Sequence, residues 1–173
     1  MRVKYQMANE IAGNLDGGKL RIGLVVSQFN ESITARLVTG AREAASIHGV
    51  AEGNLTIFYT PGSFELPAVA SKILGIAQWD AIVALGCVIR GETAHFDFVA
   101  SEAARGLAEI ARKFATPVIF GVLTTENMDQ ALARSGGALG NKGFDSMESA
   151  IKMASLYRQI DAFSTSNKEQ REK

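Results

Sequence analysis

The chain has 173 residues, a length typical of a single domain that can bury a full core without metal ions or disulfides. Its 18 basic and 18 acidic residues cancel, so no basic surface is expected and nucleic acid is disfavoured as a main partner. Cys87 is the only cysteine, which excludes an intramolecular disulfide, and the absence of a long apolar run predicts no membrane span, no signal peptide and a cytoplasmic protein.

Four short apolar runs alternate with helical patterns along the chain. The runs at 22–26, 55–59, 81–85 and 116–123 are typical of buried strands. Apolar residues recur at helical spacing in 32–48, 64–77, 93–114, 124–134 and 145–160, with Ser32 and Thr93 as the expected caps of two helices. This alternation predicts an α/β fold, a three-layer doubly wound sandwich in which a four-stranded parallel, flavodoxin-like sheet carries helices on both faces.

The two ends of the chain differ from its centre. Residues 1–160 are predicted to form one α/β domain, in which residues 1–20 are an extended arm. Residues 161–173 are polar and are predicted to be a disordered tail. No internal repeat and no second domain is expected.

Aromatic and acidic residues stand where the first two strands end. Phe29 follows the first strand, and Phe64 with Glu65 follows the second. Ligands of parallel sheets bind beyond the carboxyl ends of the strands. Phe29 is either a rim residue that packs on the next helix or a platform for a planar ligand. Glu65 either complements the dipole of the helix that it opens or accepts hydrogen bonds from a ligand.

A denser polar cluster follows the third strand. A helix that starts near Thr93 would direct free N–H groups at an anion, and an arginine nearby favours phosphate. His95 can move protons near neutral pH, although a lone histidine in the first turn of a helix is usually structural. Cys87 is expected to be buried rather than nucleophilic. Phe120, on the fourth strand, is either core or a third aromatic at a strand end.

Five sequence blocks together carry a family resemblance. They are SQFN (27–30), PGSFELP (61–67), GCVIRGETAHFD (86–97), GVLTTEN (121–127) and GNKG (140–143). In this order they resemble the 6,7-dimethyl-8-ribityllumazine synthase family, in register from about residue 14 to residue 156. The resemblance implies a transferase that condenses 5-amino-6-(D-ribitylamino)uracil with 3,4-dihydroxy-2-butanone 4-phosphate, with no metal and no redox cofactor.

The resemblance also implies a role for each matching residue. His95 would transfer protons. The phosphate would be bound by Glu92 and Thr93 through N–H groups, by Arg134 and by Lys142, with Asp145 nearby. The pyrimidine and its ribityl chain would be bound by Phe29, Ser63, Phe64, Glu65, Cys87, Val88, Ile89 and Phe120. Phe120 and Arg134 would come from a neighbouring subunit.

The resemblance further implies an assembly. Members of this family form pentamers, and in many bacteria twelve pentamers close into an icosahedral shell. The compact glycine-rich loop at 135–143 favours the shell, residues 1–20 would join a neighbour's sheet, and riboflavin synthase is a candidate partner. Two other readings stay open at this point, namely a flavin- or lumazine-binding module without catalysis and a purely shell-forming protein. His95 and Arg134 beside a helix end that can bind an anion favour chemistry over the first reading, and the polar groups at the strand ends disfavour the second.

Overall fold

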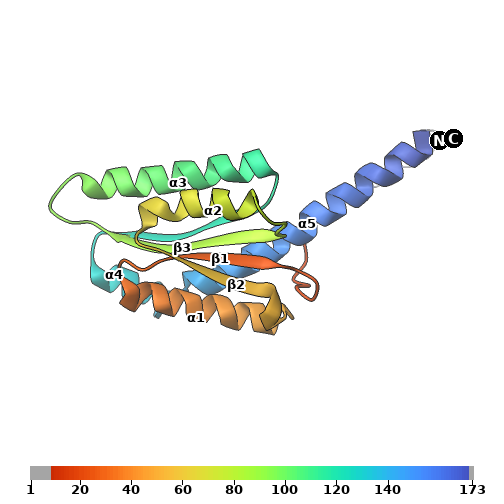
Figure 1. Ribbon diagram of the computed structural model, residues 1–173. Helices are drawn as coiled ribbons and strands as arrows, with labels where there is room; N and C mark the ends of the chain where they lie inside the picture. Colours follow the sequence, from red (N-terminus) through yellow and green to blue (C-terminus); the bar gives the residue numbers. More distant parts are fainter. Residues whose placement is uncertain (1–8, 172–173) are drawn as a thin grey trace, which may run out of the picture.

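The computed structural model describes residues 9–171 and shows a three-layer sandwich (Figure 1). Its central sheet has the strand order β2-β1-β3-β4, and all neighbouring pairs are parallel. The strands are β1 (Ile22–Ser27), β2 (Leu55–Thr60), β3 (Ala81–Ile89) and β4 (Val118–Thr125). The predicted α/β class, with a four-stranded parallel sheet between helices, is confirmed.

The third strand is longer than its apolar run predicted. It continues for four residues beyond Leu85, because Gly86 to Ile89 pair with Val122 to Thr125 of β4. A β-carbon at Gly86 would lie 2.6 Å from the Ser63 hydroxyl oxygen, so glycine at this position allows close packing rather than ending the strand. The strand β4 begins and ends two residues later than predicted.

The helices follow the strands in the predicted order. They are α1 (Glu31–Ile47), α2 (Leu66–Leu74), α3 (His95–Phe114), α4 (Met128–Ala133) and α5 (Lys142–Arg171), with 3₁₀ turns η1 (Glu52–Asn54) and η2 (Ser63–Glu65). The two predicted caps are wrong. The helix α1 starts directly after Asn30, which adopts a left-handed conformation, and α3 starts two residues after Thr93, with Ala94 at the cap position.

Two apolar clusters hold the layers together. On one face of the sheet, α1 and α5 pack against residues such as Leu24 and Leu85. On the other face, α2 and α3 pack against residues such as Val25 and Ile82 (Figure 1). Because successive strand residues point to opposite faces, a strand covered on both sides is apolar throughout, as β1 and β3 are over residues 22–26 and 81–85.

The last helix corrects the prediction of a disordered tail. It continues as α5 to Arg171 and extends beyond the sandwich (Figure 1). No glycine or proline occurs after Gly143, so no residue that strongly disfavours a helix interrupts it. Within residues 9–171 no helix is both long and apolar enough to cross a membrane.

The described part of the predicted N-terminal arm lies against α5 of the same chain. The backbone N–H of Asn14 donates to Ser155 Oγ at 3.2 Å, and Gln159 Nε2 donates to the carbonyl of Ala12 at 2.8 Å. Arg158 Nη2 donates to the carbonyl of Lys19 at 3.1 Å. Residues 1–8 of the arm lie outside the described residues, so the predicted pairing with a neighbour's sheet stays a prediction.

Candidate active site

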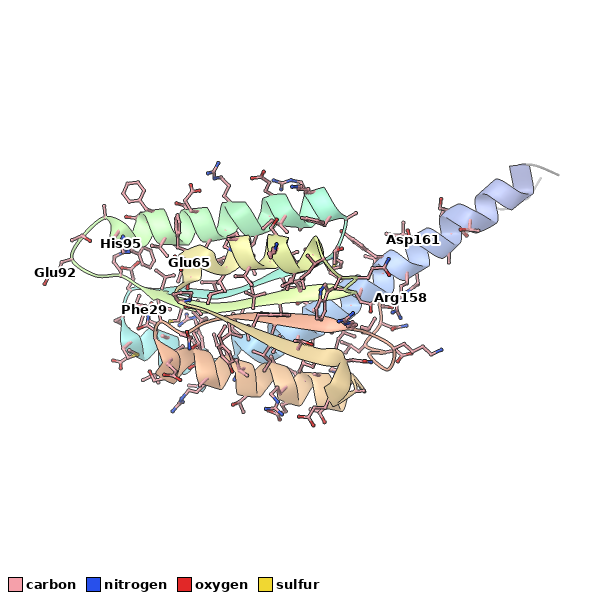
Figure 2. The ribbon with its side chains drawn as sticks, in the orientation of Figure 1. Phe29, Glu65, Glu92, His95, Arg158 and Asp161 are labelled. Carbon is pink, nitrogen blue, oxygen red and sulfur yellow. The ribbon has the colours of Figure 1, made fainter. Side chains whose placement is uncertain are left out.

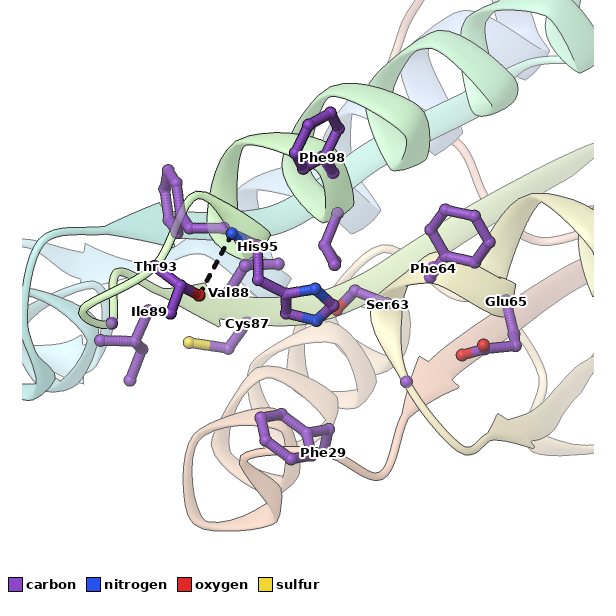
Figure 3. A pocket seen from close by; sticks show the side chains of 14 residues that line it. Phe29, Ser63, Phe64, Glu65, Cys87, Val88, Ile89, Thr93, His95 and Phe98 are labelled. Atoms are coloured by element: carbon purple, nitrogen blue, oxygen red, sulfur yellow. Dashed lines mark hydrogen bonds between the residues drawn. The ribbon is translucent and has the colours of Figure 1, made fainter.

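A cavity of about 560 Å³ opens where β1, β2 and β3 end, beside the first turn of α3 (Figure 3). In sheets of parallel strands, ligands bind beyond the carboxyl ends of the strands. Nine residues that the sequence singled out line the cavity, namely Phe29, Ser63, Phe64, Glu65, Cys87, Val88, Ile89, Thr93 and His95. The fold therefore brings together residues from three segments that are far apart in the sequence.

Phe29 is held at the mouth of this cavity by the residue that follows it. Asn30 has a φ of 58° and a ψ of 47°, a left-handed conformation that asparagine tolerates better than most residues. Its side-chain Nδ2 donates to the carbonyl of Cys87 at 3.0 Å, which ties the end of β1 to β3. Phe29 is 68% exposed, so its aromatic face is available to a ligand.

The second strand delivers three lining residues through the turn η2. Phe64 is 55% exposed, whereas Ser63 is buried. The Ser63 hydroxyl has no hydrogen-bond partner among the described residues, so it is free to donate to or accept from a ligand. Glu65 is half-buried, and a β-carbon at Gly62 would lie 2.9 Å from its Oε2 atom, so glycine leaves room for this carboxylate.

The end of β3 forms the floor of the cavity. The prediction that Cys87 is buried is confirmed, since the residue is 1% exposed. Burial raises the pKa of the Cys87 thiol to about 11, so the thiol is neutral at physiological pH and is a poor nucleophile. Val88 and Ile89 are half-buried and add apolar surface beside it.

His95 is the first residue of α3 and its imidazole lies over the cavity (Figure 3). Its backbone N–H donates to Thr93 Oγ1 at 3.4 Å, so Thr93 bonds to the helix end although it does not occupy the cap position. The loop from Gly91 to Ala94 is exposed. Its backbone N–H groups and the positive end of the α3 dipole form an anion-binding arrangement next to the imidazole.

Five predicted residues do not line this cavity, namely Glu92, Phe120, Arg134, Lys142 and Asp145. Glu92 points away from the fold at the tip of the loop (Figure 2). Phe120 lies in the middle of β4 at the edge of the sheet and is 36% exposed, so it is neither a core residue nor a residue at the strand end. Arg134 and Lys142 are exposed and lie together, because the Lys142 N–H donates to the carbonyl of Arg134 at 2.8 Å.

The glycine-rich segment that joins these two basic residues is a hairpin rather than an irregular loop. Its strands are β5 (Ser135–Gly137) and β6 (Gly140–Asn141), which pair antiparallel. Gly136 and Gly140 have φ values of 105° and 79°, a region open mainly to glycine. Asn141 fixes the hairpin to the first helix, since its Nδ2 donates to the carbonyl of Arg36 at 2.9 Å.

Three lining residues on α3 were missed by the sequence interpretation. Phe96, Phe98 and Val99 border the cavity, and Phe98 is 67% exposed. Phe98 and Val99 lie three and four residues after His95, so helical spacing places all three on one face of α3. That spacing was the signal that could have found Phe98 and Val99, whereas Phe96, one residue after His95, does not share it. Among the described residues, no group of three or more His, Cys, Asp or Glu side chains converges as in a metal site.

The chain is similar to known proteins over most of its length. The family model for 6,7-dimethyl-8-ribityllumazine synthase matches residues 19–158. A protein of Chlorobium phaeobacteroides (strain BS1) named 6,7-dimethyl-8-ribityllumazine synthase is 47% identical over 150 residues, which cover 87% of this chain and 97% of that protein. Both matches contain all the residues that line the cavity.

Proposed function

The chain belongs to the 6,7-dimethyl-8-ribityllumazine synthase family, and from that premise we propose how the residues of its pocket divide the reaction among themselves. The enzyme is a transferase that condenses 5-amino-6-(D-ribitylamino)uracil with 3,4-dihydroxy-2-butanone 4-phosphate. The product is 6,7-dimethyl-8-ribityllumazine, with release of phosphate and water, in the penultimate step of riboflavin biosynthesis.

The pyrimidine occupies the part of the cavity between β1 and β2. Its flat ring stacks on Phe29, whose exposed face supports this role. Ser63 supplies a hydroxyl that has no partner of its own among the described residues, and Phe64 and Glu65 hold the ribityl chain. Cys87, Val88 and Ile89 contact the pyrimidine from the strand end.

The phosphate of the second substrate lies at the start of α3. The N–H groups of Glu92 and Thr93 bind its oxygens, which explains how Glu92 can contribute although its side chain points into solvent. Arg134 and Lys142 do not line this cavity, and Phe120 lies on the edge strand. We assign all three to the site of a neighbouring subunit, so that each pocket is completed by the next copy of the chain.

The chemistry consists of positioning and proton transfer. The primary amine of the pyrimidine attacks the ketone, and loss of one water leaves an imine. Phosphate then leaves from C4 as the proton on C3 is lost, and the resulting enol tautomerises to a new ketone at C3. The ribitylamino nitrogen closes the ring on this ketone with loss of a second water. His95 lies between the proposed pyrimidine and phosphate positions, where it can take a proton from one group and return it to another.

This assignment rests on one observation. Phe29, Ser63 and His95 line the same cavity, beside the positive end of α3. The test is turnover of both substrates, followed by the absorbance and fluorescence of the lumazine against a control without protein. We expect His95→Ala to lower kcat about a hundredfold or more, the usual contribution of a general acid–base group, with little change in either KM.

His48→Ala is the matched control for this experiment. His48 lies at the C-terminal end of α1, at the end of the sheet opposite the cavity. Its Nε2 forms a hydrogen bond with Glu148 Oε1 at 2.9 Å. We expect the His48→Ala variant to keep the kcat of the unaltered chain. Full turnover by His95→Ala would contradict the proton-transfer role.

The proposal includes the assembly that the family resemblance implies. The chain forms a pentamer, and the compact hairpin between Arg134 and Lys142 favours closure of twelve pentamers into a shell. It acts in the cytoplasm, and riboflavin synthase, which consumes the product, is the expected further partner. The exposed positions of Phe120 and Arg134 away from their own cavity support the pentamer.

A further inference from the structure

Arg90 lies at the base of the loop that carries the anion site, yet its guanidinium is engaged with two carboxylates. Nη2 is 2.9 Å from Asp97 Oδ1, and Nη1 donates to Asp97 Oδ2 at 3.2 Å, so this pair is bidentate. Nε is 2.9 Å from Glu126 Oε2. The guanidinium carbon also lies 4.1 Å from the centroid of the Phe96 ring. Arg90 is therefore a bridge between the two carboxylates.

Asp97 lies at the end of α3 where an anion would bind, so its pairing with Arg90 affects how well that end binds an anion. Asp97 is the third residue of α3 and its N–H already donates to the carbonyl of Ala94 at 3.1 Å. A carboxylate in the first turn competes with a phosphate for the positive end of the same helix dipole. The hydrogen bonds from Arg90 hold the pKa of Asp97 below its usual range, so this carboxylate is charged at neutral pH. An uncompensated Asp97 would repel the phosphate.

Glu126 adds a second negative charge from the other side. It follows β4 directly, and the Arg90 N–H donates to the carbonyl of Thr125 at 2.9 Å, which aligns the ends of β3 and β4. The cluster of Arg90, Asp97 and Glu126 carries one positive and two negative charges. Without the guanidinium, two unpaired carboxylates would border the loop to which the phosphate is assigned.

We propose that Arg90 is a positioning residue that acts through Asp97 and Glu126, neutralising them so that the first turn of α3 can bind the phosphate of the butanone substrate. The proposal rests on the phosphate assignment made above. It assigns to Arg90 no contact with either substrate. It differs from a purely structural role because the effect of Arg90 would depend on the charge of Asp97.

The test compares phosphate binding in four full-length proteins, namely the unaltered chain, Arg90→Gln, Arg90→Gln with Asp97→Asn, and Arg105→Gln. Arg105 is the matched control, because it lies on the same helix and its guanidinium is paired with Glu102 outside the cavity. The probe is inorganic phosphate, measured by direct titration and as an inhibitor that competes with the butanone phosphate. Circular dichroism and molecular size verify that each variant is folded and assembled.

Arg90→Gln is expected to bind phosphate about five- to thirtyfold more weakly, as one charge at a distance of about one helical turn would produce. KM for the butanone phosphate rises by a similar factor, whereas KM for the pyrimidine stays unchanged. The double variant recovers to within about threefold of the unaltered chain, and the deficit of Arg90→Gln shrinks in about 0.5 M salt. Arg105→Gln binds as the unaltered chain does.

Two results would overturn the proposal. One is unchanged phosphate binding in Arg90→Gln, and the other is a double variant that binds no better than Arg90→Gln alone. If Arg90→Gln does not fold, the single variant Asp97→Asn tests the proposal instead. The proposal requires Asp97→Asn to bind phosphate at least as tightly as the unaltered chain. Since direct titration needs no turnover, a failure of the catalytic assignment to His95 would be seen separately in the substrate assay.

Discussion

Cys87 lies on the floor of the cavity that we propose as the active site, where a reactive thiol would meet an electrophilic ketone substrate. Its burial removes this hazard. The thiol is 1% exposed and its pKa is raised to about 11, because the thiolate would lose its hydration on the strand. A neutral thiol behaves as a small apolar group, so the contact with the pyrimidine that we propose for Cys87 would not lead to reaction with the second substrate.

This shift has a consequence for stability at alkaline pH. Between about pH 9 and pH 11 the unfolded chain gives up the Cys87 proton, whereas the native chain retains it. The unfolded state therefore binds fewer protons, and the free energy of unfolding falls as the pH rises through this range. In a Cys87→Ala variant this contribution is absent, so we expect a shallower decline.

The measurement is the urea midpoint of the unaltered chain and of Cys87→Ala at about pH 8 and about pH 10.5, at equal protein concentration. Other groups that titrate in this range affect both proteins alike. The difference between the two proteins in how far the urea midpoint falls between the two pH values therefore isolates the contribution of the Cys87 thiol. An equal fall of the midpoint in both proteins would show that the Cys87 thiol has the same pKa in the native and the unfolded state.

At the scale of elements, the start of α5 packs closely against α1. Gly143 lies where α5 crosses α1, and a β-carbon there would collide with the carbonyl of Leu37. Gly40 of α1 likewise leaves space for the side chain of Asn141. These two glycines let the hairpin that carries Arg134 and Lys142 lie directly on α1. The position of both basic residues thus depends on helix packing as well as on the hairpin.

Gly143→Ala is therefore expected to destabilise the chain by about 1–3 kcal/mol, the usual cost of overpacking. It should also raise KM for the butanone phosphate, because α5 and the hairpin must shift together. Gly53→Ala is the matched control, since no atom lies within 4 Å of a β-carbon built at Gly53. Urea unfolding and substrate kinetics of both variants are the measurements. Equal stability of the two would contradict the contact.

At the scale of the whole molecule, our proposal gives each chain most of one site and part of another. His95 lines the cavity, whereas Arg134 is exposed outside it. If each site takes Arg134 from the adjacent subunit, a pentamer is the smallest closed assembly that the family resemblance offers. A mass by light scattering that corresponds to a monomer would exclude shared sites.

Mixing two inactive variants tests the sharing directly. We expect His95→Ala and Arg134→Ala to have low turnover at a limiting concentration of butanone phosphate when each is assembled alone. When they are co-expressed in equal amounts, a site with His95 from one variant and Arg134 from the other is intact, which random mixing in a ring predicts for about a quarter of the sites. No recovery in the mixture would place both residues in one subunit's site.

Much of the architecture was predictable from local patterns. The order of strands and helices followed from apolar runs and helical spacing, because burial on both faces makes parallel strands apolar throughout. The lining residues Phe29 and His95 were found because parallel strands end at one edge of the sheet. These features depend on residues that are close together in the sequence.

Other features were decided only by the tertiary structure. Strand β3 extends through Gly86 because β4 pairs with it, and α1 begins after Asn30 because that side chain bonds to the carbonyl of Cys87. The engagement of Arg90 with Asp97 and Glu126 also depends on how β4 and α3 come together. The sequence by itself determined the elements, their order and the reactive residue types. Their boundaries and the partners of each charge were set by contacts between segments that no local pattern encodes.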